Sequence, residues 1–217
     1  MVFDYIDGGA EREWTLRENS RAFQDVLFRP RSAVATPSCD ITTTVLGAGI
    51  ALPIVLAPVG SSRMFYPRGE EEAARAAGDA GTIYTLSTLS GCRLEDVKTA
   101  TTGSAWYQLY LVGGRDVALK VIDRAKAAGY KALVVTVDGV SSGNREYNIR
   151  NGFTIPFTFS TRNVYDMMTH PRWLFGTMMR YLVTTGMPMY ANYPAAAKAK
   201  MTKGPMGRSS LRTDSIS

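Results

Sequence analysis

The chain is poor in cysteine and histidine, with two and one of them among its 217 residues. Cys39 and Cys92 lie far apart and fit no Cys-x-x-Cys or mixed Cys/His spacing. The sequence therefore predicts no metal site and favours two reduced thiols of a cytosolic protein. No apolar run reaches the ~18 residues that a membrane-spanning helix needs. Residues 1–10 hold acids and glycines where a secretory signal would have a basic start and an apolar run, so we expect no such signal.

Acidic residues are scarce in the last third of the chain. Residues 150–217 hold nine Lys and Arg but two Asp and Glu, a net charge of +7, whereas residues 1–149 hold 16 and 17, a net charge of −1. The overall hydrophobic content of 45% and charged content of 20% are ordinary for a globular protein. The length fits one domain with a sizeable core. The basic excess therefore needs an explanation separate from the fold.

Short apolar runs alternate with helical patterns between residues 52 and 138. Four runs have the β-branched and aromatic content of strands covered on both faces, namely 53–58, 82–87, 105–110 and 132–137. Helical patterns lie between them at 69–80, 94–100 and 116–129. This repeat predicts an α/β fold with parallel strands joined by crossover helices. A doubly wound sheet and a barrel both fit, and since a closed eight-stranded barrel takes ~250 residues, this chain would supply half of one.

The third helical pattern carries recognisable end signals. Asp116 stands where a capping residue is expected, and Gly129 stands at the expected C-terminal stop. Val117, Val121 and Ala125 place an apolar stripe on one face. We therefore expect a helix over residues 116–129 that packs against the sheet.

The carboxyl ends of the predicted strands carry small and polar residues. In parallel α/β folds, functional groups collect at these ends. The residues are Ala57, Pro58, Val59, Gly60, Ser61, Ser87, Thr88, Gln108, Tyr110, Thr136 and Asp138. Small residues let a flat ligand approach the backbone, and polar residues two apart on a strand face the same way. We expect a ligand site at this rim, with a merely polar cap of the barrel as the alternative.

Arg145 follows the fourth predicted strand in the sequence Gly-Asn-Arg-Glu. Arginine is the natural bidentate partner of a carboxylate, so it could hold an acidic substrate. The alternative is a surface ion pair between Arg145 and Glu146.

Residues 154–217 differ from the rest of the chain. They combine Trp173, Phe175, Tyr181 and Tyr190 with several methionines and the basic excess. A membrane-surface segment fits this composition, a lid over the active site is the second reading, and nucleic-acid binding lacks a recognised module. From residue 195 onward the chain is small, basic and without periodicity, which predicts an irregular, mobile loop.

Ordered motifs over residues 1–153 resemble the FMN-dependent L-2-hydroxy-acid oxidase and dehydrogenase family, which includes glycolate oxidase, L-lactate dehydrogenase and (S)-mandelate dehydrogenase. The motifs are VFDYIDGGA (2–10), FRPR (28–31), TTVLG (43–47), LAP (56–58), TLS (85–87), YQLY (107–110), TVD (136–138) and RE (145–146). HPRW (170–173) and GMP (186–188) are similar to the mandelate and lactate dehydrogenases. The resemblance implies the N-terminal half of a (β/α)8 barrel, with four strands in residues 1–153 and a long basic aromatic loop over 154–217.

The resemblance also implies roles for individual residues. FMN would be contacted by Ala57, Pro58, Val59, Gly60, Ser87, Gln108 and Thr136. Tyr5 and Arg145 would bind the substrate carboxylate, Tyr110 would bind the hydroxyl or carbonyl oxygen, and Asp138 would orient the catalytic histidine and raise its basicity. The implied reaction oxidises an L-2-hydroxy acid of lactate or mandelate type to the 2-oxo acid, and a quinone or another acceptor takes the electrons. An oxygen-using oxidase is the alternative.

The family's histidine base, its second arginine and its Asp-Gly-Gly phosphate loop have no counterpart in this sequence. The single histidine, His170, stands in another context, and we expect it to be structural. The site would then be completed by a C-terminal barrel half absent from the chain, and an inactive half-barrel that needs a second chain is the competing hypothesis. We further expect a homo-oligomer in the cytoplasm, with the inner membrane surface as the alternative location.

Overall fold

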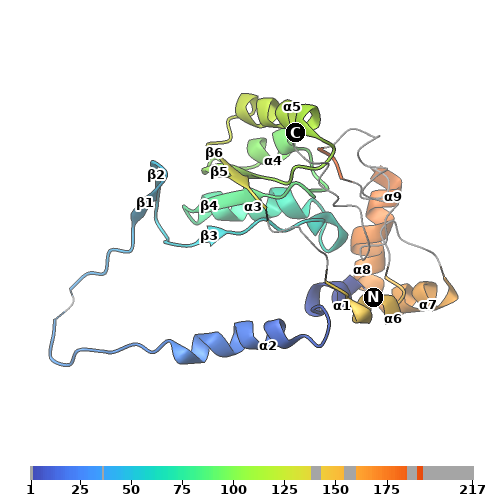
Figure 1. The fold of residues 1–217 in the computed structure, drawn as a ribbon, viewed down its shortest axis with the longest axis horizontal. Coiled ribbons are helices and arrows are strands. Elements are labelled where there is room, and N and C mark those ends of the chain that lie inside the picture. Colours follow the sequence, from blue (N-terminus) through green and yellow to red (C-terminus); the bar gives the residue numbers. More distant parts are fainter. Residues whose placement is uncertain (1, 36, 138–142, 154–159, 185–189, 193–217) are drawn as a thin grey trace.

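The computed structural model describes residues 2–35, 37–137, 143–153, 160–184 and 190–192. A parallel sheet packed against helices forms the body of this part of the chain (Figure 1). An N-terminal arm that carries α2 (Trp14–Arg21) runs away from the body, and the helices that follow residue 145 lie at the other end, beside the N-terminus (Figure 1). The predicted irregular loop from residue 195 onward lies outside the described residues.

Four parallel strands make up the central sheet in the order β3-β4-β5-β6. Their bounds are β3 (Val55–Leu56), β4 (Ile83–Leu86), β5 (Ala105–Leu109) and β6 (Ala132–Val135). The connecting helices are α3 (Gly69–Asp79), α4 (Leu94–Thr99) and α5 (Arg115–Ala127). Each strand lies beside the next one in the chain, without the reversal of order that marks a doubly wound sheet. The predicted parallel α/β fold is confirmed, and of the two alternatives the strand order favours the barrel.

The hydrophobic core lies between the sheet and its three helices. The register aligns Tyr84 with Ala105 and Leu86 with Tyr107, so alternate residues of β4 and β5 face the same side. The buried core residues are Ala74, Ala77, Tyr84, Leu86, Cys92, Leu94, Val97, Tyr107, Leu109, Ala118, Val121 and Ala125. The stripe predicted on α5 is confirmed, because Val121 and Ala125 are buried and Val117 packs against the same core.

Helix cover ends at β6. Leu133 and Val135 are aligned with Tyr107 and Leu109 of β5, and so lie on the side that the helices cover elsewhere. Their exposed fractions are nevertheless 39% and 51%. Their aligned partners Tyr107 and Leu109 are 0% and 1% exposed. The last strand therefore presents a partly uncovered apolar face.

The ends of α5 confirm one of the two end signals and correct the other. The helix begins at Arg115 after Gly114, whose φ is 91°, and no side chain caps it. Asp116 is therefore not the cap; it lies in the first turn, where its charge still suits the positive end of the helix. Gly129 has a φ of 87° and donates its amide to the Lys126 carbonyl at 3.0 Å, as expected for a C-terminal stop.

The N-terminal arm touches the body at its two ends. It comprises α1 (Val2–Asp7), α2, the 3-10 turn η1 (Ala22–Asp25) and an antiparallel hairpin of β1 (Thr43–Val45) and β2 (Ala48–Ile50). Directly after the hairpin, the Ala51 amide donates to the Gly81 carbonyl at 2.8 Å. Between these anchor points the arm exposes Phe23, Val26, Leu27 and Phe28. The arm thus carries apolar side chains that the described part of the chain does not bury.

A group of short helices follows β6 and packs against the loop after β3. They are α6 (Glu146–Arg150), α7 (Thr161–Thr169), α8 (Pro171–Trp173), the π-helical turn η3 (Leu174–Met179) and α9 (Arg180–Thr184). The Trp173 Nε1 donates to the Met64 carbonyl at 2.8 Å, and the Arg68 amide donates to the Tyr181 hydroxyl at 2.9 Å. The Arg63 guanidinium lies 4.6 Å from the centre of the Tyr181 ring. None of the described helices has the length and apolarity needed to cross a membrane.

Candidate active site

A buried glutamine ties together the carboxyl ends of three strands. The Gln108 Oε1 accepts a hydrogen bond from the Thr88 amide at 3.0 Å, and its Nε2 donates to the Thr136 Oγ1 at 2.9 Å. The Thr88 hydroxyl in turn donates to the Gln108 carbonyl at 2.6 Å. Gln108 is only 2% exposed, so these bonds fix which way its amide points. Because Thr136 accepts from Gln108, its own hydroxyl hydrogen can donate to a ligand above the rim.

The loops after β3 and β4 touch each other beside this network. The Ser61 amide donates to the Leu89 carbonyl at 2.9 Å, and the Leu89 amide donates to the Ser87 Oγ at 3.1 Å. A Cβ on Gly60 would lie 2.9 Å from the Leu89 Cβ, closer than real contacts allow. Gly60 is therefore required by the neighbouring loop, whatever ligand lies above it. The other small residues predicted at this end, Ala57, Pro58 and Val59, are exposed and open to a ligand.

A buried carboxylate that the sequence did not single out lies below these loops. Glu70 is in the first turn of α3, and its Oε1 accepts from the Ser62 amide at 3.1 Å and from the Gly91 amide at 2.9 Å. The Cys92 thiol donates to the other oxygen at 3.3 Å. Burial, followed by the nearby carboxylate of Glu70, raises the pKa of the Cys92 thiol. Glu70 thus fixes the two loops relative to each other, and three consecutive glutamates were the only signal in the sequence.

Tyr5 and Arg145, 140 residues apart in the chain, lie against each other. The Arg145 Nη2 donates to the carbonyls of Tyr5, at 2.7 Å, and Gly8, and its guanidinium lies 4.7 Å from the centre of the Tyr5 ring. The Tyr5 ring stacks on Phe153 at 4.5 Å and, more distantly, on Phe65 at 6.3 Å. Phe65 ends the 3-10 turn η2 (Ser62–Met64), so this pair adjoins the loop after β3.

The remaining predicted site residues are placed less fully. Glu146 forms its ion pair with Arg150 at 3.0 Å, which argues against the alternative pairing with Arg145. Tyr110 is half-buried directly after β5, and its amide donates to the Thr88 Oγ1 at 2.9 Å. Asp138 lies outside the described residues.

His170 belongs to the junction of α7 and α8. Its Nδ1 lies 2.8 Å from the Asp166 carbonyl and 3.1 Å from the Thr169 Oγ1, and its side chain is exposed. These local contacts agree with a structural role for the ring.

A parallel sheet in consecutive strand order, with polar groups gathered at its carboxyl rim, defines this chain as part of a β/α-barrel protein. The chain belongs to the family described as FMN-dependent dehydrogenase, whose pattern matches residues 1–216. FMN is accordingly the cofactor of the family, and the resemblance seen in the sequence is confirmed.

The relatives include plant glycolate oxidases and solved structures of (S)-mandelate dehydrogenase. The chain is 43% identical over 163 residues to glycolate oxidase 3 of Arabidopsis thaliana and to glycolate oxidase of Spinacia oleracea; in each case this covers 75% of the chain and 44% of the relative. A crystal structure of the monotopic membrane protein (S)-mandelate dehydrogenase matches with a TM-score of 0.83 and 33% identity, covering 92% of this chain and 54% of that one. A soluble mutant of the membrane-associated (S)-mandelate dehydrogenase from Pseudomonas putida matches with a TM-score of 0.68 and 34% identity, covering 75% and 46%. The chain thus spans about half the length of these proteins.

Proposed function

We propose that this chain provides the flavin-ring and substrate-carboxylate side of a site that oxidises 2-hydroxy acids with FMN. The observation that carries the proposal is the junction of two groups: the Gln108–Thr136 pair at the rim, and the Tyr5–Arg145 pair that adjoins the same rim through Phe65. The first group suits the polar edge of a flavin ring. The second suits an anionic ligand beside it, because a guanidinium backed by carbonyls keeps its remaining N–H groups for a carboxylate.

The fit of FMN to the described residues is good on the ring side. Thr136 has a hydroxyl hydrogen to donate, and the turn after β3 exposes Ala57, Pro58 and Val59 to a ligand. These are the residues expected to hold the ring: Ala57, Pro58, Val59, Gly60, Ser87, Gln108 and Thr136. When bound, FMN supplies the acceptor of the hydride equivalent.

The chain's own residues orient the substrate. Tyr5 and Arg145 bind the carboxylate, so that the 2-hydroxyl group faces Tyr110. The Tyr110 hydroxyl holds the substrate oxygen, and Asp138 fixes the protonation state of the base that completes the site. Orientation and charge stabilisation are therefore the contribution of this half.

The substrate class is an L-2-hydroxy acid of mandelate or lactate type, and the electron acceptor is a quinone or another membrane acceptor. The support for this choice over an oxygen-using glycolate oxidase is the longer structural match to the monotopic (S)-mandelate dehydrogenase. The helices after residue 160 add to it, because Phe175, Leu182 and Val183 are exposed beside Arg172 and Arg180. Exposed apolar side chains next to arginines suit the surface of an anionic membrane.

Further strands of the barrel pair with β6, and the helices that accompany them cover its exposed face. Two features support this part of the proposal: the exposed Leu133 and Val135 on β6, and the exposed apolar residues of the arm.

Flavin binding tests the proposal. The purified chain is mixed with FMN, alone and with the C-terminal barrel half of a family member, and free FMN is removed. We expect yellow protein in the mixture, bleached without oxygen by (S)-mandelate or L-lactate. Gln108→Leu should lose the colour, whereas Gln24→Leu on the exposed arm should keep it. A colourless mixture with the unmodified chain would refute the proposed function, and peroxide formed at the rate of bleaching in air would refute the choice of acceptor.

Membrane association is tested separately by sedimentation with vesicles of phosphatidylcholine and phosphatidylglycerol. We expect the chain to pellet with the anionic vesicles, and Val183→Asp to abolish this. Leu27→Asp, an equally exposed position on the arm, is the matched control. Equal pelleting of Val183→Asp and the unmodified chain would remove the helices after residue 160 as the membrane-binding surface.

A further inference from the structure

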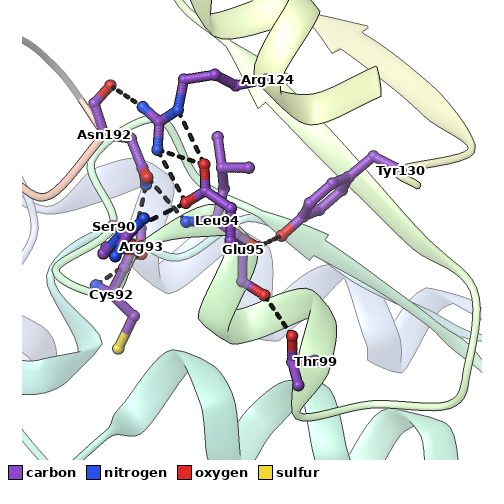
Figure 2. Close-up of polar contacts among 9 residues, drawn as sticks. All are labelled: Ser90, Cys92, Arg93, Leu94, Glu95, Thr99, Arg124, Tyr130 and Asn192. Carbon is purple, nitrogen blue, oxygen red and sulfur yellow. Dashed lines mark hydrogen bonds and ion pairs between the residues drawn. The ribbon is translucent and has the colours of Figure 1, made fainter. Parts of the chain in front are cut away.

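Residues 190–192 return to the rim of the sheet and are fastened there by a buried asparagine. Asn192 is 2% exposed, and its hydrogen-bond partner Leu94 lies 98 residues earlier in the chain. Its Oδ1 accepts from the Leu94 amide at 2.8 Å, and its Nδ2 donates to the Cys92 carbonyl at 3.0 Å (Figure 2). Both ends of the side-chain amide are therefore used, and the first residue of α4 receives the acceptor that its own cap, Arg93, does not supply.

Arg124 on α5 strengthens this attachment from the neighbouring helix. Its Nη1 donates to the Asn192 carbonyl at 3.2 Å, while its Nε and Nη2 each donate to the Glu95 carboxylate at 2.9 Å (Figure 2). Burial raises the pKa of Glu95, but hydrogen bonds from its own backbone and from Arg124 outweigh this and hold the pKa below its usual value. The ion pair is thus formed at neutral pH, and α4, α5 and the returning chain are held in one cluster.

The attachment determines where Tyr190 lies. Ala191 donates its amide to the Ser90 carbonyl at 3.0 Å, so the returning chain crosses the loop after β4. Tyr190 itself is only 7% exposed, its side chain is hydrogen-bonded with Ser61, and it lies within electrostatic range of Tyr5. Ser61 belongs to the rim loop beside the expected flavin residues, and Tyr5 belongs to the expected carboxylate site. Tyr190 is therefore held at the rim loop, near the expected carboxylate site.

We propose that Asn192 is a positioning residue that fastens residues 190–192 to the rim and so makes Tyr190 a wall of the substrate site. The attachment can be decided on the chain alone, whereas the role of the wall rests on the proposed function. The buried amide of Asn192 has a physical reason to act this way, since an isosteric apolar side chain would leave the Leu94 amide without its acceptor and leave the Cys92 carbonyl with the Ser90 hydroxyl as its donor. The phenol ring of Tyr190 then limits the space for the side chain of the acid, which makes it a specificity-determining residue.

Hydrogen exchange of individual backbone amides tests the attachment without flavin. In Asn192→Leu we expect the Leu94 and Ala191 amides to exchange at least about tenfold faster, the loss expected for one hydrogen bond, with the β5 amides unchanged. Asn19→Leu, on the exposed side of α2, should change neither. If the β5 amides also accelerate, Arg124→Lys is used, because it removes the contact to the Asn192 carbonyl and leaves the Asn192 side chain in place. Unchanged exchange at Leu94 in Asn192→Leu would overturn the attachment.

The position of Tyr190 has its own test. In chain labelled with 3-fluorotyrosine, the fluorine resonance of Tyr190 is assigned from its absence in Tyr190→Phe. We expect this resonance to move in Ser61→Ala and in Asn192→Leu, and to stay in Asn19→Leu. If the chemical shift of this resonance stays the same in both variants, Tyr190 is not held at the rim, and the proposal is overturned.

The wall is tested in the flavin-loaded mixture. Asn192→Leu should raise KM for L-lactate about tenfold while kcat stays within about twofold, because a looser wall weakens binding without touching the reacting atoms. Tyr190→Ala should raise the ratio of kcat/KM for (S)-mandelate over L-lactate by about tenfold or more, because space opens for the phenyl group. An unchanged ratio would overturn the assignment of Tyr190 as a wall of the substrate site. A mixture that never binds FMN would refute the proposed function and the wall together, while the exchange experiment still decides the attachment.

Discussion

Strands β4 and β5 differ from β6 in one respect, the cover over their apolar side chains. Leu86 and Leu109 are inaccessible beneath α3, α4 and α5, whereas Leu133 and Val135 on the neighbouring strand are exposed. The residue types are alike, so the difference does not lie in the strands. Apolar patterning shows which side chains a fold is built to bury, and the elements present decide which of them are buried.

The proposed site spans the boundary between these two regions. Gln108 belongs to the covered strands, and its partner Thr136 directly follows β6. Gln108 and Glu70 thus fix the part of the rim that belongs to the helix-covered strands β4 and β5. We infer that this part of the rim is ordered before a ligand or partner binds, and that β6 gains its stability when further barrel strands pack beside it.

The largest expected effect is the loss of a covered core residue. Leu109→Ala should lower the free energy of unfolding by about 2–5 kcal/mol, because it leaves a cavity beneath the helices. Val135→Ala, half-exposed on β6, should cost less than about 1 kcal/mol. Urea denaturation of the purified chain measures both, and equal losses would show that β6 is covered in solution.

The next largest expected effect distinguishes buried Glu70 from Glu72, whose side chain is 39% exposed. Glu70→Leu leaves the amides of Ser62 and Gly91 without their acceptor, so we expect a loss of about 2–4 kcal/mol. Glu72→Leu, in the same turn of α3, should stay within about 0.5 kcal/mol. Both values come from urea denaturation. A similar loss in the two variants would contradict the role of Glu70 in joining the loops.

The reactivity of the two cysteines distinguishes the helix-covered part of the chain from the exposed arm. Cys92 is buried and its pKa is raised, first by burial and then by Glu70, so it stays a neutral thiol at pH 8. Cys39 is exposed on the arm. Iodoacetamide should therefore modify Cys39 at least about a hundredfold faster, with Cys92 reacting only after unfolding. Mass spectrometry of the alkylated chain gives both rates, and comparable rates would mean that the covered side opens readily.

The sequence predicted the elements of the body because their patterns are local. Strand runs, the helix stripe and the i, i+2 placement of polar residues follow from short-range periodicity, and Gln108 at the rim was found in this way. Contacts between residues far apart in the sequence could not be predicted from it. Nothing in the sequence marks Glu70 over the two glutamates that follow it, or pairs Asn192 with Leu94 across 98 residues. Which residues form such contacts depends on which loops meet, and the loops meet only when the sheet forms.

The smallest effect compares two glycines whose change to alanine should have opposite signs, one at the end of α5 on the helix-covered side and one in the helices after residue 160. Gly129 ends α5 with a φ of 87°, so Gly129→Ala should cost about 1 kcal/mol through backbone strain alone, since a Cβ there would meet nothing within 4 Å. Gly176 is exposed within η3, and its Cβ would also meet nothing within 4 Å. Gly176→Ala should therefore stabilise the chain by about 0.4–1 kcal/mol, because it restricts the unfolded state. Thermal denaturation followed by circular dichroism measures both. A destabilising Gly176→Ala would mean that the helices after residue 160 do not keep this conformation in solution, and the exposed apolar surface assigned to them would have to be reconsidered.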